Sequence, residues 1–322
     1  MKILTIGKKN ILHWVENLND ALITNAHTVE TLFLNELSLT DTFQKNLLKV
    51  ISKDLMYNKL QNIIERKIES FQPDLIIVVS PFMFNEKIFE CFDKFDNIIK
   101  YAWIGDRFSS HHKNIANKFD QLFVTDSAFV DDCISFDFPT AIYLPLAVNQ
   151  KMFYDKKLYR NNNLLFIASY TKQRQELLNQ IDSIDMKLVG SKWDEKQLLK
   201  NITYINKNIS IDDVAEAYNK SKFILNIKHE HNVMNGLNMR TFEAISAGGC
   251  LLQDYVSDVE LNFEIDKDIL VYKNLEELNY LIEKLQKDKE FYKNIISYGE
   301  KLVSAKHTYN QRIESMLECF KG

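Results

Sequence analysis

The chain has 322 residues, more than one hydrophobic core usually supports, so two domains are expected. Its composition, 46% hydrophobic and 26% charged, excludes a disordered, collagen-like or coiled-coil chain. The net charge of −4 gives no basic surface for nucleic acid, and the four cysteines lack the paired spacing of a zinc site or a disulfide framework. No run approaches the ~20 apolar residues that cross a membrane. The start, MKILTIG, is too short for a signal peptide, so a cytoplasmic location is expected.

Short apolar runs alternate with longer helical patterns in the first half, which is typical of βαβ units and a parallel sheet. A helix is predicted over residues 47–71, where apolar residues recur at helical spacing. The predicted strands are 2–6, 74–79, 98–104, 121–124 and 141–144. This half is therefore expected to form one open α/β domain.

The polar stretch 155–163 is interpreted as a junction, after which the alternation starts again. Strands are predicted at 164–167, 186–189, 223–227 and 250–253, and helices at 172–181, 211–220 and 239–247. Residues 275–320 show a nearly continuous helical pattern. The predicted organisation is an N-terminal domain over 1–152, a C-terminal domain over 153–305, and a helix over 306–322 that returns toward the first domain.

Open parallel sheets bind ligands at the carboxyl ends of their strands, where helix N-termini point. The most informative segment is 235–254, in which Asn238 is a natural N-cap and Gly248 a natural C-cap of a short helix. Arg240 lies in the first turn, where a cation opposes the helix dipole by about 0.3–1 kcal/mol. A bound diphosphate would reverse that cost, and Glu243 could accept hydrogen bonds from a ribose diol. The alternative is an exposed Arg240–Glu243 pair worth about 0.3 kcal/mol.

This segment, NGLNMRTFEAISAGGCLLQD, resembles the donor-domain signature of the GT-B glycosyltransferases, in the CgeB-like (spore-maturation) branch. Four further segments are similar to the same family and occur in the family's order. They are YLPLAVN at 143–149, LFIAS at 165–169 followed by Arg174, YNKSKFILN at 218–226 and HTYNQR at 307–312. Ala168 stands where the family usually has glycine.

The resemblance implies an α/β fold of the GT-B type, with two Rossmann-like doubly wound domains facing across a cleft and C-terminal helices. It implies transfer of a sugar from a nucleotide diphosphate-sugar, with a UDP-sugar as the default donor and no metal or other cofactor. A glycan, lipid-linked or protein acceptor is expected, without nucleic acid, and peripheral association with the inner face of a membrane stays open. In this family Arg240 would bind the diphosphate and Glu243 the ribose. Asn235 stands where retaining enzymes carry a second Glu, which leaves the stereochemical outcome open.

Residues that directly follow strands complete the predicted donor site, and each has a structural alternative. The Ser169–Thr171 stretch could contact phosphate or cap a helix, and Lys228 could bind phosphate or be solvated. Trp193 could stack on a base or pack against its neighbours. The predicted donor-binding residues are Gly7, Ser169, Arg174, Gly190, Lys228, Asn235, Asn238, Arg240, Thr241 and Glu243.

The predicted catalytic residues are Asp106, His111 and Arg240. Asp106 follows a strand in WIGDRF, where an inverting enzyme would keep a general base; the alternative is a loop residue or helix cap. His111 and His112 could take the same role, bind the acceptor or be exposed loop residues. The acidic pairs at 131–132 and 212–213 lack DxD spacing, so no metal site is predicted.

Two other functions stay open at this point. One is a non-catalytic protein of the same fold in a coat or glycan assembly, suggested by the departures at Asn235 and Ala168. The other is a nucleotide-sugar 2-epimerase. The sequence identifies neither the sugar, the base, the acceptor nor the oligomeric state.

Overall fold

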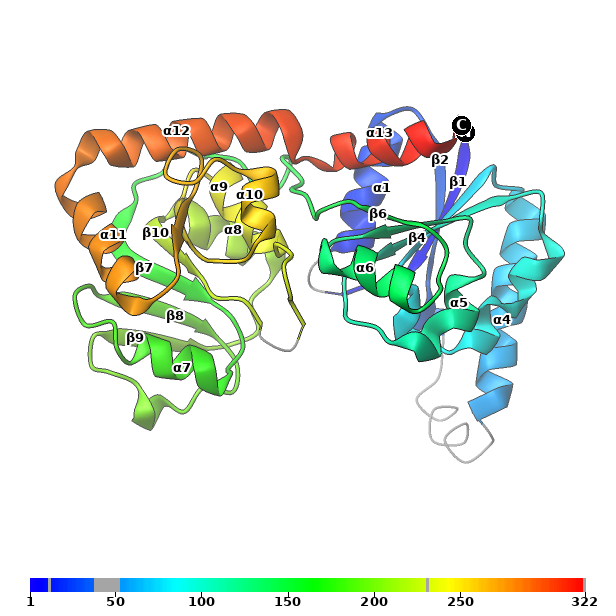
Figure 1. Ribbon diagram of the computed structural model, residues 1–322, viewed down its shortest axis with the longest axis horizontal. Helices are drawn as coiled ribbons and strands as arrows, with labels where there is room; N and C mark the ends of the chain where they lie inside the picture. Colours follow the sequence, from blue (N-terminus) through cyan, green and yellow to red (C-terminus); the bar gives the residue numbers. More distant parts are fainter. Residues whose placement is uncertain (11–12, 38–52, 230–231, 321–322) are drawn as a thin grey trace. The chain divides into compact units, whose positions relative to one another are not determined.

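The computed structural model describes residues 1–10, 13–37, 53–229 and 232–320 (Figure 1). The chain divides into two compact units. The N-terminal unit comprises Met1–Pro145 with Arg312–Gly322, and the C-terminal unit comprises Leu146–Gln311. Each contains one six-stranded sheet in which the neighbouring strands run parallel, with helices packed on it. The predicted α/β fold with two parallel-sheet domains is confirmed.

The N-terminal sheet has the strand order β2-β1-β3-β4-β5-β6. Its strands are β1 (Lys2–Gly7), β2 (Thr28–Phe33), β3 (Leu75–Val79), β4 (Ile99–Ile104), β5 (Gln121–Val124) and β6 (Ala141–Tyr143). All five predicted strands are present, and β2 was not predicted. The strand β3 is buried along its whole length, because a parallel sheet covered on both faces needs strands that are apolar on both sides.

The helices of this unit are α1 (Trp14–Thr24), α2 (Leu34–Leu37), α4 (Lys53–Phe71), α5 (Lys113–Ala116) and α6 (Ala128–Ser135). The described part of this unit also contains the 3₁₀ segments η1 (Pro81–Met83), η2 (Glu86–Lys94) and η3 (Ser110–His112). The helix predicted over 47–71 is observed as α4, and its first residues, 47–52, lie outside the described residues. The buried side of α4 contributes Leu60, Ile64 and Ile68 to the core.

The C-terminal sheet has the order β12-β11-β10-β7-β8-β9. Its strands are β7 (Asn161–Ile167), β8 (Met186–Gly190), β9 (Ile202–Asn206), β10 (Ser221–Asn226), β11 (Cys250–Asp254) and β12 (Leu270–Tyr272). The four predicted strands are present, and β9 and β12 were not predicted. The chain adds β8 and β9 on one side of β7 and then β10 to β12 on the other, so the strand order reverses between β7 and β10.

The helices of the C-terminal unit begin with α7 (Lys172–Leu178), α8 (Ile211–Asn219), α9 (Met239–Ser246) and α10 (Asp258–Asn262), with η4 (Glu195–Gln197) between them. The predicted helical tail forms α11 (Leu275–Lys287), α12 (Lys289–Lys306) and α13 (Tyr309–Phe320) (Figure 1). No helix in the part of the chain that the structure describes is long and apolar enough to cross a membrane.

The stretch predicted as a junction belongs to the body of the C-terminal unit. Arg160, just before β7, donates to the carbonyl oxygens of Tyr218 (2.8 Å) and Ala247 (2.6 Å), which lie at the ends of α8 and α9. It also donates to Asp155 Oδ1 at 2.9 Å. A cation at a helix C-terminus satisfies carbonyls that lack a partner within the helix. The stretch therefore lies within the C-terminal unit and not at a junction, and Arg160 in it fixes the ends of two helices.

Candidate functional site

The carboxyl ends of β7, β10 and β11 and the N-terminus of α9 lie at the point where the C-terminal strand order reverses. Three polar residues lie at these ends: Asn226 ends β10, Asp254 ends β11, and Asn238 precedes α9. Ligand sites of doubly wound sheets form at such a reversal, since adjacent loops diverge there and leave a crevice. The candidate site is therefore built from these ends.

The helix α9 begins after Asn238, as predicted, but the Asn238 side chain makes no capping hydrogen bond. Its amide faces Asn226 instead, with both Nδ2–Oδ1 distances at 3.1 Å. The first N–H groups of α9 thus keep their partial positive charge, which an asparagine at this position normally neutralises. At the other end, Gly248 has φ +74° and closes the helix: the Gly248 N–H donates to the Ile245 carbonyl and the Gly249 N–H to the Ala244 carbonyl.

Arg240 lies in the first turn of α9, half-buried. Its Nη1 donates to Asn226 Oδ1 at 2.7 Å, while its buried Nε has no hydrogen-bond partner among the described residues. Glu243, one turn deeper, is only 9% exposed. The alternative of an exposed Arg240–Glu243 pair is therefore wrong, because Glu243 is buried and Arg240 bonds to Asn226. A buried guanidinium N–H without a partner is a donor available to a bound anion.

Burial raises the pKa of Glu243 from 4.5 to about 7, and the nearby positive charge of Arg240 limits the rise. A carboxyl group in an apolar surrounding loses the hydration of its charged form. A buried carboxyl group lowers the stability of the fold unless a ligand or a protein partner compensates for its lost hydration. Carboxyl groups with pKa values perturbed in this way are common at functional sites. Glu243 is thus placed to accept hydrogen bonds from a ligand that enters beside Arg240.

Replacing Glu243 with glutamine is expected to make the ligand-free protein more stable than wild type at about pH 8, with the difference vanishing near about pH 4.5. A raised pKa means that the folded protein holds its proton more tightly than the unfolded chain does. The contribution of Glu243 to the free energy of unfolding of the wild type therefore falls as the pH rises from 4.5 to about 7. Chemical denaturation at several pH values measures the difference, and Glu276→Gln, at an exposed position, is the control. If the free energy of unfolding depends on pH in the same way in wild type and Glu243→Gln, the burial argument is contradicted.

Arg174 connects the ends of β7 and β10. Its Nη1 donates to the Ser169 carbonyl at 3.1 Å and its Nη2 to the Ile227 carbonyl at 2.8 Å, and the residue is 5% exposed. Thr171 caps α7 by accepting from the Arg174 N–H, which is the structural alternative predicted for this stretch. Ser169 itself is exposed. Arg174 therefore fixes the two strand ends, and its contact with a donor stays a prediction.

Gly190 ends β8 with φ +155°, and a Cβ there would lie 1.9 Å from the Ala168 carbonyl oxygen. Only glycine allows these two strand ends to approach so closely. Trp193 is 6% exposed and donates from Nε1 to the same Ala168 oxygen at 2.9 Å. The packed alternative therefore holds for Trp193, whose ring belongs to the core and is not available for a base.

The remaining predicted donor residues occupy different positions. Lys228 is half-buried and donates its backbone N–H to Asp254 Oδ2 at 2.8 Å. Thr241 is fully buried and donates to Gln253 Oε1 at 2.9 Å, so it supports the site from within the protein. The Asn235 carbonyl accepts from the first N–H of α10. Gly7 lies in the N-terminal unit, where a Cβ at this position would lie 2.6 Å from Val15 Cγ2 of α1. The missing side chain therefore leaves room for α1 to pack against β1.

Asp106 and His111 also belong to the N-terminal unit. Asp106 follows the carboxyl end of β4 and is half-buried, and His111 is exposed in η3, with Nδ1 3.4 Å from Ser109 Oγ. His112 accepts at Nδ1 from the Ser109 N–H and packs on Phe82, which is a structural role. Among the described residues, no group of three or more His, Cys, Asp and Glu could hold a metal ion.

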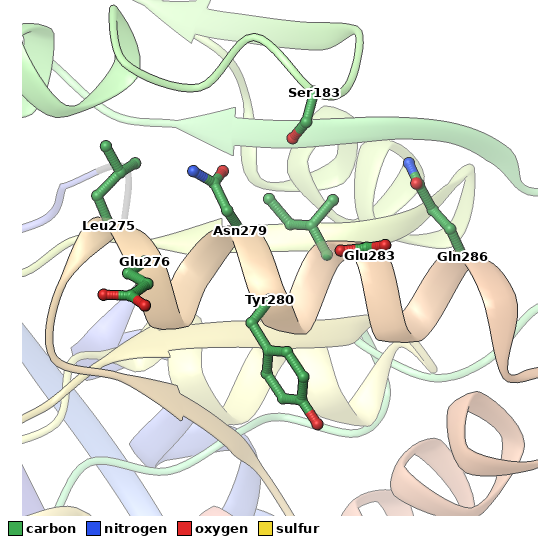
Figure 2. Close-up of a pocket in the computed structure, with 8 residues that line it drawn as sticks. Ser183, Leu275, Glu276, Asn279, Tyr280, Glu283 and Gln286 are labelled. Carbon is green, nitrogen blue, oxygen red and sulfur yellow. The ribbon is translucent and has the colours of Figure 1, made fainter.

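A pocket of about 650 Å³ lies elsewhere in the C-terminal unit, beside α11 (Figure 2). It is lined by Ser183, Leu275, Glu276, Asn279, Tyr280, Ile282, Glu283 and Gln286. None of the predicted site residues lines it, so this pocket is not the candidate site.

Residues 172–318 match the family model described as "Glycosyl transferase-like". No curated protein sequence matches the chain. Among solved structures, sucrose-phosphate synthase from Thermosynechococcus elongatus is 12% identical, with a TM-score of 0.69 over 100% of this chain and 98% of that one. A glycosyltransferase from Rickettsia africae is 12% identical, with a TM-score of 0.72 over 99% and 97% of the two chains.

Anabaena HepE, solved in complex with UDP and glucose, is 14% identical, with a TM-score of 0.67 over 99% of this chain and 100% of that one. At such identities the likeness shows the fold, and it extends over both units. The matched family segment begins at α7 and includes Arg240 and Glu243. The chain thus has the two-domain α/β fold of the GT-B glycosyltransferases, and its C-terminal half is similar to the glycosyl transferase-like family.

Proposed function

We propose that this protein is a glycosyltransferase that moves a sugar from a nucleotide diphosphate-sugar, with UDP as the nucleotide, to a glycan, lipid-linked or protein acceptor. The observation that carries the proposal is the N-terminus of α9. Its capping residue is turned away, Arg240 has a buried donor without a partner, and Glu243 is buried beside that arginine. The family match over 172–318 and the complexes of HepE with UDP, UDP-glucose and UDP with glucose support the proposal.

The proposed chemistry is stabilisation of a leaving group. An acceptor hydroxyl attacks the anomeric carbon, the bond to the diphosphate oxygen breaks, and the hydroxyl proton goes to a general base. The N–H groups of α9 and the Arg240 guanidinium face the negative charge that develops on the diphosphate. Because fixed positive charge is supplied by the chain itself, we propose that transfer needs no metal ion. Glu243 accepts hydrogen bonds from the ribose hydroxyls, which compensate its burial.

Calorimetry with UDP, GDP, ADP and CDP, each in the presence of EDTA, tests the proposal. We expect UDP to bind with EDTA present; binding only after addition of a divalent cation would overturn metal independence. Absence of binding by every nucleoside diphosphate would overturn the proposed function. Incubation with UDP-sugars then separates the classes: release of UDP and sugar indicates a transferase, an epimerised sugar nucleotide indicates an epimerase, and binding without turnover indicates a non-catalytic protein.

We assign the general base to Asp106, at the carboxyl end of β4. Replacing it with asparagine is expected to lower kcat by about a hundredfold or more, within the ~10²–10⁴ contributed by acid–base catalysis, while UDP affinity stays unchanged. Asp96→Asn is the matched control, since Asp96 is an exposed carboxylate that precedes the other end of the same strand. Initial rates with UDP-sugar and acceptor give kcat, and calorimetry gives the affinity. A variant with full kcat would remove Asp106 from the reaction.

A further inference from the structure

A chain of buried polar side chains lies directly behind Arg240. Asn226, the last residue of β10, is fully buried. Its Oδ1 accepts from Arg240 Nη1 at 2.7 Å, and its Nδ2 donates to Gln253 Oε1 on the neighbouring strand β11, also at 2.7 Å. Both are short hydrogen bonds in a buried region, where they are strong and leaving them unmade is costly. Asn226 therefore links the sheet to the arginine.

The orientation of the Asn226 amide is set from the other end of this chain. Gln253 directs its Nε2 to Asp254, donating to Oδ1 at 2.8 Å and to the backbone oxygen at 2.9 Å. Its Oε1 must then face the opposite way, where it accepts from Asn226 and from the Thr241 hydroxyl. An amide side chain donates from its nitrogen and accepts at its oxygen, and these two atoms point in different directions. With Nδ2 directed to Gln253, Asn226 can only present its oxygen to Arg240.

Asn226 has a second effect, on the capping residue of α9. The Asn238 amide pairs with the Asn226 amide in both directions, at 3.1 Å each. An asparagine at an N-cap ordinarily accepts hydrogen bonds from the first N–H groups of the helix. The pairing holds the Asn238 side chain away from those groups, of which the Thr241 N–H bonds instead to the Asn238 backbone oxygen at 3.1 Å.

We propose that Asn226 is the positioning residue of the anion site: it holds the Arg240 guanidinium in place and withdraws Asn238 from the end of α9. The identity of the anion rests on the proposed function. Asn226 itself touches no ligand, because it is fully buried behind Arg240. The site is therefore assembled before any nucleotide arrives.

Replacing Asn226 with alanine removes both effects, and Asn238 becomes free to cap α9. We expect the affinity for UDP to fall by about tenfold, which corresponds to ~1.4 kcal/mol. The affinity for uridine should change little, since the nucleoside lacks the diphosphate. An equal loss for UDP and uridine, or no loss for UDP, would overturn the proposal. If Asn226→Ala does not fold by circular dichroism, Asn226→Ser, which keeps a small polar side chain, takes its place under the same criteria.

A control and a double-mutant cycle separate positioning from stability. Ser246, also in α9, is 2% exposed and donates to the Phe153 carbonyl at 2.6 Å. Ser246→Ala loses one buried hydrogen bond of the same helix and should leave UDP affinity unchanged. If Asn226 acts through Arg240, then Asn226→Ala should cost no further affinity in an Arg240→Ala background. Additive losses would show that Asn226 acts by another route.

A measurement without ligand keeps this inference distinct from the proposed function. Arginine side-chain NMR should show separate signals for the two Nη groups of Arg240 in the wild type, because the bond to Asn226 restricts rotation of the guanidinium. The signals should merge in Asn226→Ala and remain separate in Ser246→Ala. Merged signals in the wild type would overturn the positioning role. Separate signals in a protein that binds no nucleoside diphosphate would keep the positioning of Arg240 and overturn the proposed function alone.

Discussion

Replacing Arg240 with alanine is expected to weaken UDP binding by about a hundredfold or more, because removing one partner of a desolvated charge-assisted contact costs ~2–5 kcal/mol. The variant removes the buried Nε donor and takes from Glu243 the nearby positive charge that lowers its pKa. Without that charge the pKa of Glu243 rises further, which favours its neutral form, and the diphosphate enters a site that has lost its cation. Calorimetry at low and high salt measures the loss, which should be larger at low salt.

The matched variant for this prediction is Arg240→Lys. It keeps the positive charge but loses the planar guanidinium that can hold Asn226 and a phosphate oxygen at the same time. We expect an affinity between those of wild type and Arg240→Ala. If folded Arg240→Ala binds UDP as well as the wild type, Arg240 has no part in the site.

The second large effect is expected on stability. Replacing Arg160 with alanine should lower the free energy of unfolding by ~3–5 kcal/mol, the usual cost of removing one partner of a buried ion pair. The side chains of Arg160 and Asp155 are 11% and 12% exposed. The variant leaves the Asp155 carboxylate with less compensation and takes a donor from the carbonyl groups that end α8 and α9. Chemical denaturation at neutral pH, followed by circular dichroism, measures the change.

Lys157 provides the control, because it pairs with the same carboxylate but its side chain is 77% exposed. Lys157→Ala should cost less than ~1 kcal/mol, as exposed ion pairs do. Burial alone would raise the pKa of Asp155, but hydrogen bonds from Lys157 and Arg160 and the charge of Arg160 lower it below its ordinary value of 3.8. A lowered pKa gives stability above pH 3.8 that is lost as the pH falls through the folded-state value. The difference between wild type and Arg160→Ala should therefore shrink in acid.

The strands that the sequence pattern did not predict are all at sheet edges: β2, β9 and β12. Central strands such as β3 are apolar on both faces and form a continuous apolar run that is easy to recognise. The edge strand β2, TVETLF, has three polar residues among its six and only Leu32 is buried, and β12 has only three residues. The pattern therefore predicts the buried middle of each sheet and misses three of the four edge strands, β6 being the edge strand that it predicts.

The candidate site was predicted as a helix start with Arg240 and Glu243, and the structure places both residues there. The role of Asn226 was not predicted, since a polar residue at the end of an apolar strand has many uses and its partners come from separate segments. Asn226 and Gln253 do share one signal: each directly follows three apolar residues, 223–225 in β10 and 250–252 in β11. Which side chain an amide faces depends on strand register and on the position of α9, and neither can be derived from local spacing.

The amide chain behind Arg240 has a consequence for how this site can change over evolution. The Asn226 side chain forms hydrogen bonds with Asn238, Arg240, Thr241 and Gln253. A replacement at position 226 alone therefore leaves several buried polar atoms without a hydrogen-bond partner. Acceptable changes must then occur together, with complementary donors and acceptors at the partner positions. Among homologous sequences, positions 226, 238 and 253 are expected to covary, whereas exposed positions nearby vary independently.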